Sequence, residues 1–170
     1  MKTIFKYTIV MLMLMHITKI EAQDKRFTFS VYTEPQHYST DIWNEADGFN
    51  IGLAIEYQMT IMYLKAQTFI FPDLNGATYF DFQATLIGFN HHSKRDNYRI
   101  FAGGKAGLIK RESYTYPVVG LEYGFEYYFD NTFFIGLQAS NDYRTDDKYW
   151  DSSASGYMSF NAGLKFGFQF

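Results

Sequence analysis

The last segment of the chain alternates strictly between apolar and polar residues. Its apolar positions are Met158, Phe160, Ala162, Leu164, Phe166, Phe168 and Phe170, and small or polar residues occupy the positions between them. A repeat of two residues indicates a β-strand, because successive side chains of a strand point to opposite faces. One face of this strand must therefore lie against nonpolar surroundings, and the chain ends on that face with an aromatic ring.

This ending resembles the C-terminal targeting strand of bacterial outer-membrane β-barrels. In that class, the barrel-insertion machinery recognises a terminal aromatic residue and the alternating apolar residues before it. The matching residues here are Leu164, Phe166, Phe168 and Phe170. The resemblance implies that the protein lies in the outer membrane of a Gram-negative cell and that these four residues form its insertion signal.

The other end of the chain has the layout of a secretory signal peptide. Lys2 and Lys6 flank the start of an apolar stretch over residues 7–17, and a short polar segment ends at Ala22. The stretch is shorter than the ~20 apolar residues that a transmembrane helix needs. We therefore expect a signal peptide over residues 1–22 and one barrel domain over residues 23–170. The absence of Cys excludes a lipoprotein anchor and a disulfide framework.

Similar alternation recurs in segments long enough to cross a membrane as tilted strands, which takes ~9–11 residues each. The segments predicted as strands are residues 26–33, 47–58, 61–71, 77–90, 98–111, 118–128, 133–144 and 154–170. An even number of strands closes into a barrel without leaving an edge. Long connections after the first and seventh segments predict extracellular loops, which puts both termini on the periplasmic side.

We therefore predict an all-β fold, an eight-stranded antiparallel up-and-down transmembrane barrel. In its pattern and its last strand, the chain resembles the small outer-membrane barrels of the OmpA transmembrane domain and OmpX-like class. The alternative is a secreted soluble barrel that turns its apolar face inward around a ligand. Glycines on the polar face, such as Gly103, Gly124 and Gly167, favour the membrane barrel because they suit a narrow, crowded lumen.

The charge of the chain gives no sign of a nucleic-acid partner. The net charge is −3, and the 15 Lys and Arg residues are scattered rather than gathered into one basic face. The expected partners are outer-membrane lipid and, during assembly, the barrel-insertion machinery. A larger outer-membrane protein complex remains an open alternative.

Acidic and basic residues are balanced on the polar face of the predicted strands. They are Glu56, Lys65, Asp81, Arg99, Lys105, Glu122, Glu126 and Lys165. The interior of an eight-stranded barrel is just wide enough for side chains to fill it. Buried charges in so tight a space must be paired and hydrogen-bonded. We predict an ion-pair network that plugs the lumen, and the alternative is a gated proton or ion path through the same residues.

No catalytic motif is complete in the chain. Residues 138–141 resemble the His-x-Ser-Asn motif of lipid A deacylases, but Gln138 stands where the His should be. Without an imidazole, nothing obvious deprotonates Ser140. The resemblance therefore leaves a lipid A-modifying enzyme as the weakest of the functional hypotheses, and no catalytic residue or cofactor is predicted.

Two further groups of residues were candidates for metal binding. His91 and His92 are neighbours, and neighbouring residues of a strand point to opposite faces, so we expect no shared metal. Four acidic residues lack the spacing of a calcium loop, and we interpret them as exposed loop charge. They are Asp142, Asp146, Asp147 and Asp151.

Aromatic residues are frequent in the predicted outer loops. They are Tyr38, Trp43, Tyr114, Tyr116, Tyr149 and Trp150. Exposed aromatic side chains beside polar residues are typical of recognition surfaces. We therefore expect a non-enzymatic structural or surface-recognition protein that acts through its outer loops, with an accessory subunit of a larger outer-membrane machine as the alternative.

Overall fold

The computed structural model describes residues 26–33, 36–37, 50–74, 77–129, 132–150, 152–153 and 155–170. The predicted signal peptide lies outside the described residues, so it stays a prediction. The elements are β1 (Arg26–Thr33), β2 (Gln36–His37), β3 (Ile51–Gln58), β4 (Met62–Leu74), β5 (Ala77–His92), β6 (Tyr98–Arg111), β7 (Tyr114–Tyr128), β8 (Phe133–Arg144), α2 (Asp147–Trp150) and β9 (Tyr157–Gln169).

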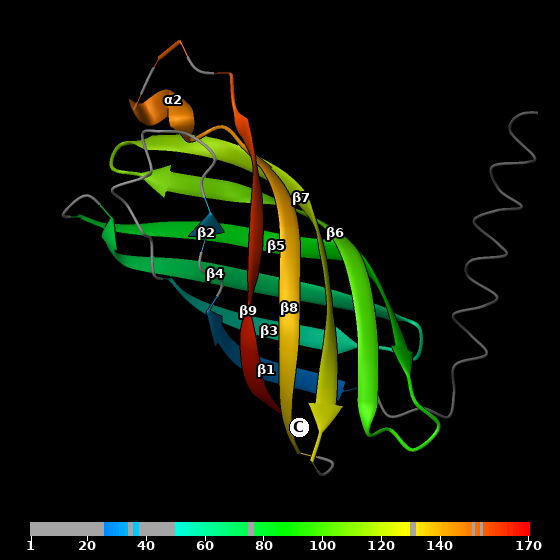
Figure 1. The fold of residues 1–170 in the computed structure, drawn as a ribbon. Helices are drawn as coiled ribbons and strands as arrows, with labels where there is room; N and C mark the ends of the chain where they lie inside the picture. Colours follow the sequence, from blue (N-terminus) through cyan, green and yellow to red (C-terminus); the bar gives the residue numbers. More distant parts are fainter. Residues whose placement is uncertain are drawn as a thin grey trace, which may run out of the picture.

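The strands form a closed antiparallel barrel (Figure 1). Each long strand pairs with the next one in sequence, from β1 and β3 through to β8 and β9, and β9 pairs again with β1. The two-residue strand β2 pairs with β9 beyond the end of β1. The predicted eight-stranded up-and-down barrel is therefore confirmed.

The last residue of the chain takes part in closing the barrel. The Phe170 backbone N–H donates to the Phe27 carbonyl oxygen at 2.8 Å, and the Phe27 N–H donates to the Phe170 carbonyl oxygen at 3.2 Å. In the same pairing, Phe29 lies opposite Phe168. Closure satisfies the backbone groups that would otherwise form an open sheet edge.

The strands differ from the predicted segments at several boundaries, and β4, for example, ends at Leu74 instead of at residue 71. Strand β7 begins at Tyr114 rather than at residue 118, so β6 and β7 form a tight hairpin. The predicted loop at 145–153 contains the short helix α2. In β5, a bulge near Leu86 and Ile87 turns both of these apolar side chains outward, and alternation resumes in the opposite phase after it.

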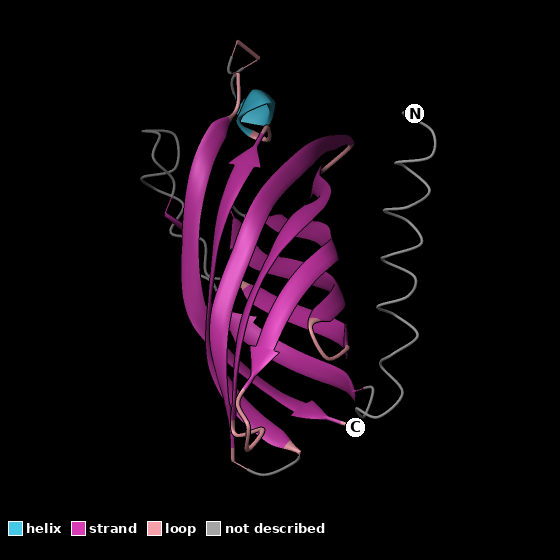
Figure 2. Ribbon diagram, turned by 90° about the vertical axis from the view of Figure 1, so that its right-hand side faces the viewer, coloured by secondary structure: helices cyan, strands magenta, loops and turns pink. Residues whose placement is uncertain are grey.

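We name the two ends of the barrel by what they carry. The terminal end is where β1 begins and β9 ends, and the α2 end carries α2 and the connection between β8 and β9 (Figure 2). No helix among the described residues is long and apolar enough to cross a membrane.

The outer wall of the barrel is apolar. Leu86, Leu121 and Leu137 each expose at least 60% of their surface on it. At the terminal end aromatic rings gather on this wall, where the Phe27 ring lies 4.8 Å from Tyr57 and 6.1 Å from Phe170 between centroids. The structure thus turns the apolar face outward, and the alternative of a soluble barrel with an apolar cavity is wrong.

The inner wall carries large aromatic rings, although the alternation predicted mainly small and polar residues on this face. Large rings lie beside glycines at directly opposed positions of neighbouring strands, and these pairs are Gly52 with Tyr32, Gly88 with Tyr63, Gly124 with Phe101, and Gly167 with Phe134. A Cβ atom at any of these glycines would lie within 2.5 Å of the ring. The glycines therefore let each ring lie flat against the wall, which leaves the centre of the lumen to charged side chains.

Candidate functional site

All eight charged residues predicted for the lumen are buried inside the barrel, and each takes part in an ion pair. With four residues that the prediction lacked, they form three clusters along the lumen. The terminal-end cluster contains Glu56, Arg99, Glu126 and Lys165; the middle cluster contains Lys65, Lys105, Glu122 and Asp142; the α2-end cluster contains Asp81, Arg111, Arg144 and Asp146. Each cluster holds two cations and two carboxylates, so charge is balanced locally.

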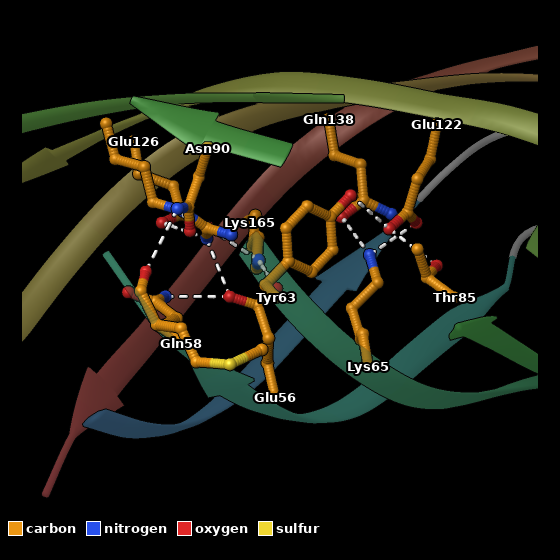
Figure 3. A network of polar contacts seen from close by, with 12 residues as sticks. Glu56, Gln58, Tyr63, Lys65, Thr85, Asn90, Glu122, Glu126, Gln138 and Lys165 are labelled. Atoms are coloured by element: carbon orange, nitrogen blue, oxygen red, sulfur yellow. Dashed lines mark hydrogen bonds and ion pairs between the residues drawn. The ribbon is translucent and has the colours of Figure 1, made fainter. Parts of the chain in front are cut away.

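The terminal-end cluster is centred on Glu126. Its carboxylate accepts from Arg99 Nη1 at 2.9 Å and from Lys165 Nζ at 2.6 Å, and the Tyr128 hydroxyl donates to it at 2.8 Å. Arg99 Nη1 also lies 2.7 Å from Glu56 Oε1. Figure 3 shows Glu56, Glu126 and Lys165 converging inside the wall.

Aromatic rings enclose the cations of this cluster. The Arg99 guanidinium carbon lies 4.8 Å from the centroid of the Tyr63 ring and 4.8 Å from that of Phe101. Lys165 Nζ lies 5.1 Å from the Phe101 centroid and 5.5 Å from that of Phe134. Such cation–π contacts are strongest where water is excluded. The rings that cover the glycines therefore also stabilise the buried cations.

The middle cluster contains the shortest of the lumen ion pairs, between Lys65 Nζ and Glu122 Oε2 at 2.5 Å. The other oxygen of Glu122 accepts hydrogen bonds from the Tyr63 hydroxyl and from Thr85 Oγ1, both at 2.8 Å (Figure 3). Lys65 also donates to Gln138 Oε1 at 3.1 Å. Four strands thus meet in one hydrogen-bonded group.

Gln138 and Ser140, from the segment that resembles a deacylase motif, are buried on the lumen side of β8, on the same face as Asp142 of the middle cluster. Lys105 Nζ lies 3.0 Å from Asp142 Oδ2, and Asn161 Nδ2 donates to Ser140 Oγ at 3.1 Å. Ser140 is fully buried. The histidines whose side chains are described, His91 and His92, lie in the β5–β6 region at the terminal end. The structure therefore gives the Ser140 hydroxyl the Asn161 amide as a hydrogen-bond donor, and it places the described histidines at the end of β5.

The α2-end cluster is a ring of two arginines and two aspartates. Arg111 pairs with Asp81 at 2.9 Å and with Asp146 at 2.8 Å, while Arg144 pairs with Asp81 at 2.7 Å and with Asp146 at 3.2 Å. Tyr157 donates to Asp146 Oδ1 at 3.2 Å. Burial by itself raises the pKa of Asp146, but the attraction of Arg144 and Arg111 outweighs it and lowers this pKa below its ordinary value.

Asp146 and its neighbours correct one interpretation of the sequence. Asp142, Asp146 and Asp147 are buried, not exposed loop charge, and Asp151 lies outside the described residues. Asp142 faces the lumen from β8, and Asp146 folds back into the lumen from the connection after β8. Asp147 instead holds that connection together, because it accepts hydrogen bonds from the backbone N–H groups of Lys148 and Gly156.

Four tyrosines lie side by side at the α2 end. Ring centroids are 6.4 Å apart for Tyr114 and Tyr116, 6.0 Å for Tyr114 and Tyr149, and 6.4 Å for Tyr79 and Tyr149. We call Tyr79, Tyr114, Tyr116 and Tyr149 the tyrosine row. Tyr114 and Tyr116 belong to strand β7 instead of to a loop as predicted, and the prediction lacked Tyr79 of β5.

The other three aromatic residues predicted for the outer loops are Tyr38, Trp43 and Trp150. Tyr38 and Trp43 lie outside the described residues, and of Trp150 only its place at the end of α2 is described. Within the part of the chain that the structure describes, no three His, Cys, Asp or Glu residues are grouped so that they would hold a metal ion.

The closed barrel with an apolar wall and a polar interior defines the fold of small eight-stranded transmembrane β-barrels. The chain matches no family model, and no curated protein matches its sequence. The N-terminal β-barrel domain of Pseudomonas aeruginosa OprF is similar to it in structure, with 16% identity, a TM-score of 0.54, and coverage of 86% of this chain and 100% of that one.

Two further solved structures have a similar fold. Neisserial surface protein A (NspA) shows 10% identity and a TM-score of 0.54, with 85% of this chain and 95% of that chain covered. A de novo designed transmembrane β-barrel shows 10% identity and a TM-score of 0.55, with 88% and 99% covered. At these identities the likeness lies in the fold, so function must be argued from the residues of this chain.

Proposed function

We propose that the protein is a non-enzymatic outer-membrane β-barrel whose lumen is plugged by paired charges and which acts as a surface-recognition protein through its α2 end. The observation that carries this proposal is the stack of three charge-balanced clusters inside the barrel. Charged side chains paired in this way stabilise the barrel and fill its lumen. We therefore look for the binding function on the surfaces that face away from the lumen.

The apolar outer wall supports a membrane location. Large apolar side chains such as Leu86, Phe89 and Leu121 each expose more than half of their surface on the outside of the barrel. In water such a wall would be an aggregation site, whereas in lipid every one of these side chains is favourably solvated. The polar interior has the opposite preference, so the two faces together fit a bilayer.

The geometry of the clusters supports a plug rather than a pore. Each carboxylate accepts from at least one cation, and neighbouring rings such as Phe101 fill the space beside the cations. An ion that entered the lumen would have to replace these contacts, and an uncompensated buried charge costs several kcal/mol. We therefore expect the paired state to persist at neutral pH.

The tyrosine row supports recognition at the α2 end. Tyr114 and Tyr116 of β7 and Tyr149 of α2 lie at the rim, and Tyr79 of β5 is buried beneath Tyr149, where its ring lies 5.1 Å from the Arg111 guanidinium carbon and supports the row from inside. Tyr114 exposes 61% of its surface there. Tyrosines give a large, rigid contact area with a polar tip, and they are enriched among the residues that dominate binding energy at interfaces.

The location is tested by fractionation of cells that express the full chain. The mature protein should be recovered with the outer membrane, and unboiled samples should migrate differently from boiled ones in gels, because a closed barrel satisfies its backbone hydrogen bonds internally and resists detergent. Recovery in the soluble periplasm would contradict the proposed location.

The mode of action is tested by purification from native membranes in mild detergent. A surface-recognition protein should be recovered without a stoichiometric membrane partner.

Proteoliposomes that carry the protein should bind to members of a panel of immobilised glycans and matrix proteins, and Tyr114→Ser should reduce that binding. A stoichiometric outer-membrane partner would instead support an accessory subunit of a larger complex, and binding that is unchanged in Tyr114→Ser would contradict recognition by the tyrosine row.

A further inference from the structure

We propose that the terminal end of the barrel carries a binding site for a phosphate group. A pocket of about 310 Å³ lies there, between the start of β1, the β3–β4 turn and the β5–β6 turn. Its ionisable lining residues are Arg26, His91, His92, Lys94 and Asp96. This site is separate from the tyrosine row at the other end, so it goes beyond the function proposed above and does not depend on it.

The pocket has more positive than negative groups. Arg26 and Lys94 are cations at neutral pH, and Asp96 is the carboxylate among the lining residues. Arg26 Nη2 pairs with Asp96 Oδ2 at 2.9 Å, which leaves the other guanidinium nitrogens for a ligand. Lys94 has no ion-pair partner among the described residues. The pocket therefore attracts an anion, with Asp96 opposing it.

Hydrogen bonds hold the walls of the pocket in place without a ligand. Asn90 Nδ2 donates to the carbonyl oxygens of Met59 and Thr60, at 3.1 and 3.3 Å, and so joins the β3–β4 turn to β5. Ser93 Oγ accepts from the backbone N–H groups of Asn97 and Tyr98, at 3.1 and 3.2 Å. A preformed site loses less entropy when it binds.

The donors of the pocket suit a phosphate. Guanidinium and ammonium groups are the side chains that bind phosphate oxygens most often, because they combine positive charge with several N–H donors. The pocket has an apolar residue at its edge, because exposed Ile61 of the β3–β4 turn lines it at the rim of the barrel. A phospholipid whose headgroup lies at this rim would thus bring its phosphate to Arg26 and Lys94, and free phosphate from solution offers the same chemistry.

Binding is measured on the full chain in neutral detergent and in nanodiscs. In the first arm, inorganic phosphate is titrated while the backbone amide resonances of residues 90–98 are followed by NMR. In the second, nanodiscs of a galactosyl diacylglycerol receive increasing amounts of phosphatidylglycerol. Saturable shifts in both arms indicate that the site accepts free phosphate, and shifts in the second arm alone indicate a lipid headgroup. Either result supports a phosphate site, and the absence of saturable shifts in both arms overturns it.

Substitutions separate a phosphate site from a merely basic rim. Lys94→Gln should weaken binding about fivefold, the effect expected for one cation near a membrane surface. Asp96→Asn should tighten binding, because it removes the opposing carboxylate, and Asn tolerates the positive φ of 54° at this position. Lys110→Gln, a loss of one exposed cation at the α2 end, should leave binding unchanged.

The result with Asp96→Asn is the most discriminating. If Asp96 opposes the ligand, phosphate affinity should rise in this variant, whereas if the Arg26–Asp96 pair only holds the pocket together, phosphate affinity should fall or be lost. Affinity that falls in Asp96→Asn, or that falls equally in Lys94→Gln and Lys110→Gln, would overturn the proposal. Heat-modifiable migration in gels verifies that each variant is folded before its affinity is compared.

Discussion

Lys65 and Glu122 form a 2.5 Å ion pair although their strands, β4 and β7, are separated in the barrel wall by β5 and β6. The pair therefore crosses the lumen instead of running along the wall. Arg144 and Asp81 do the same between β8 and β5 at 2.7 Å. Contacts of this kind join strands that share no backbone hydrogen bonds, so they tie opposite sides of the barrel together.

Removal of one member of a crossing pair should destabilise the barrel strongly. Glu122→Gln leaves Lys65 buried without its counter-charge, and we expect the free energy of unfolding to fall by about 3–5 kcal/mol. The measurement is urea unfolding of protein folded in lipid vesicles. Lys110→Gln, at an exposed position, should change stability little.

A double variant tells pairing apart from simple packing. Lys65→Met combined with Glu122→Gln removes both charges, and it should recover much of the stability lost by Glu122→Gln alone. If the two single losses instead add up, the two side chains do not interact and our assignment of the middle cluster is wrong.

The pairing of glycines with aromatic rings gives a second prediction. A Cβ atom at Gly88 would lie 2.2 Å from the Tyr63 ring, whereas one at Gly104 would meet nothing within 4 Å. Gly88→Ala should therefore cost about 1–3 kcal/mol of unfolding free energy, because Tyr63 must leave its place beside Glu122. Gly104→Ala, the matched change on the outer wall, should be close to neutral. Equal effects in the two variants would count against the inward packing of Tyr63.

Acid should weaken the α2 end through Asp146. The pKa of Asp146 is lowered in the folded protein, so its pairing with Arg111 and Arg144 contributes fully above the ordinary aspartate pKa of about 3.9. The contribution is lost as pH falls through the lower, folded-state pKa. Asp146→Asn should therefore be less stable than the parent at pH 7, and the difference should shrink below about pH 4. A difference that does not depend on pH would contradict this assignment.

The last residue should matter for assembly as well as for closure. Deletion of Phe170 removes its contact with Phe27, and replacement of Phe166 and Phe168 by Ser removes two of the four residues of the predicted insertion signal. Both changes should sharply lower the amount of heat-modifiable protein in the outer membrane. Phe82→Ser, at another exposed position of the outer wall, provides the control. An equal loss in Phe82→Ser would show that lipid-facing burial alone is responsible.

The fold was predictable because lipid-facing and lumen-facing residues alternate along every strand of a membrane barrel, which gives the sequence a period of two. Every long strand was found, since the apolar side must face lipid along its whole length. The bulge at Leu86 and Ile87 was not foreseen, because two adjacent apolar residues are compatible with either phase of the alternation. That shift of phase also hid Gly88, which the structure places on the inner wall beside Tyr63.

The lumen network was predicted only in part, for reasons that differ between residues. Arg111 and Arg144 continue the inward phase of β6 and β8, so the alternation itself contained the signal that they face the lumen. Asp146 lies beyond β8, where no periodicity applies, and only the tertiary structure shows that it folds back onto these arginines. Tyr79 contacts Tyr149, which is remote from it in sequence, so only the tertiary structure shows that it belongs to the tyrosine row.

The conductance of the purified barrel in planar lipid bilayers tests the central claim most directly. If the three clusters plug the lumen, the unmutated protein should show no steady current at neutral pH, even though heat-modifiable migration demonstrates that it is folded and inserted. A stable, ohmic channel formed by the folded protein would show that ions pass Arg99, Lys65 and Arg144, and it would contradict the plug.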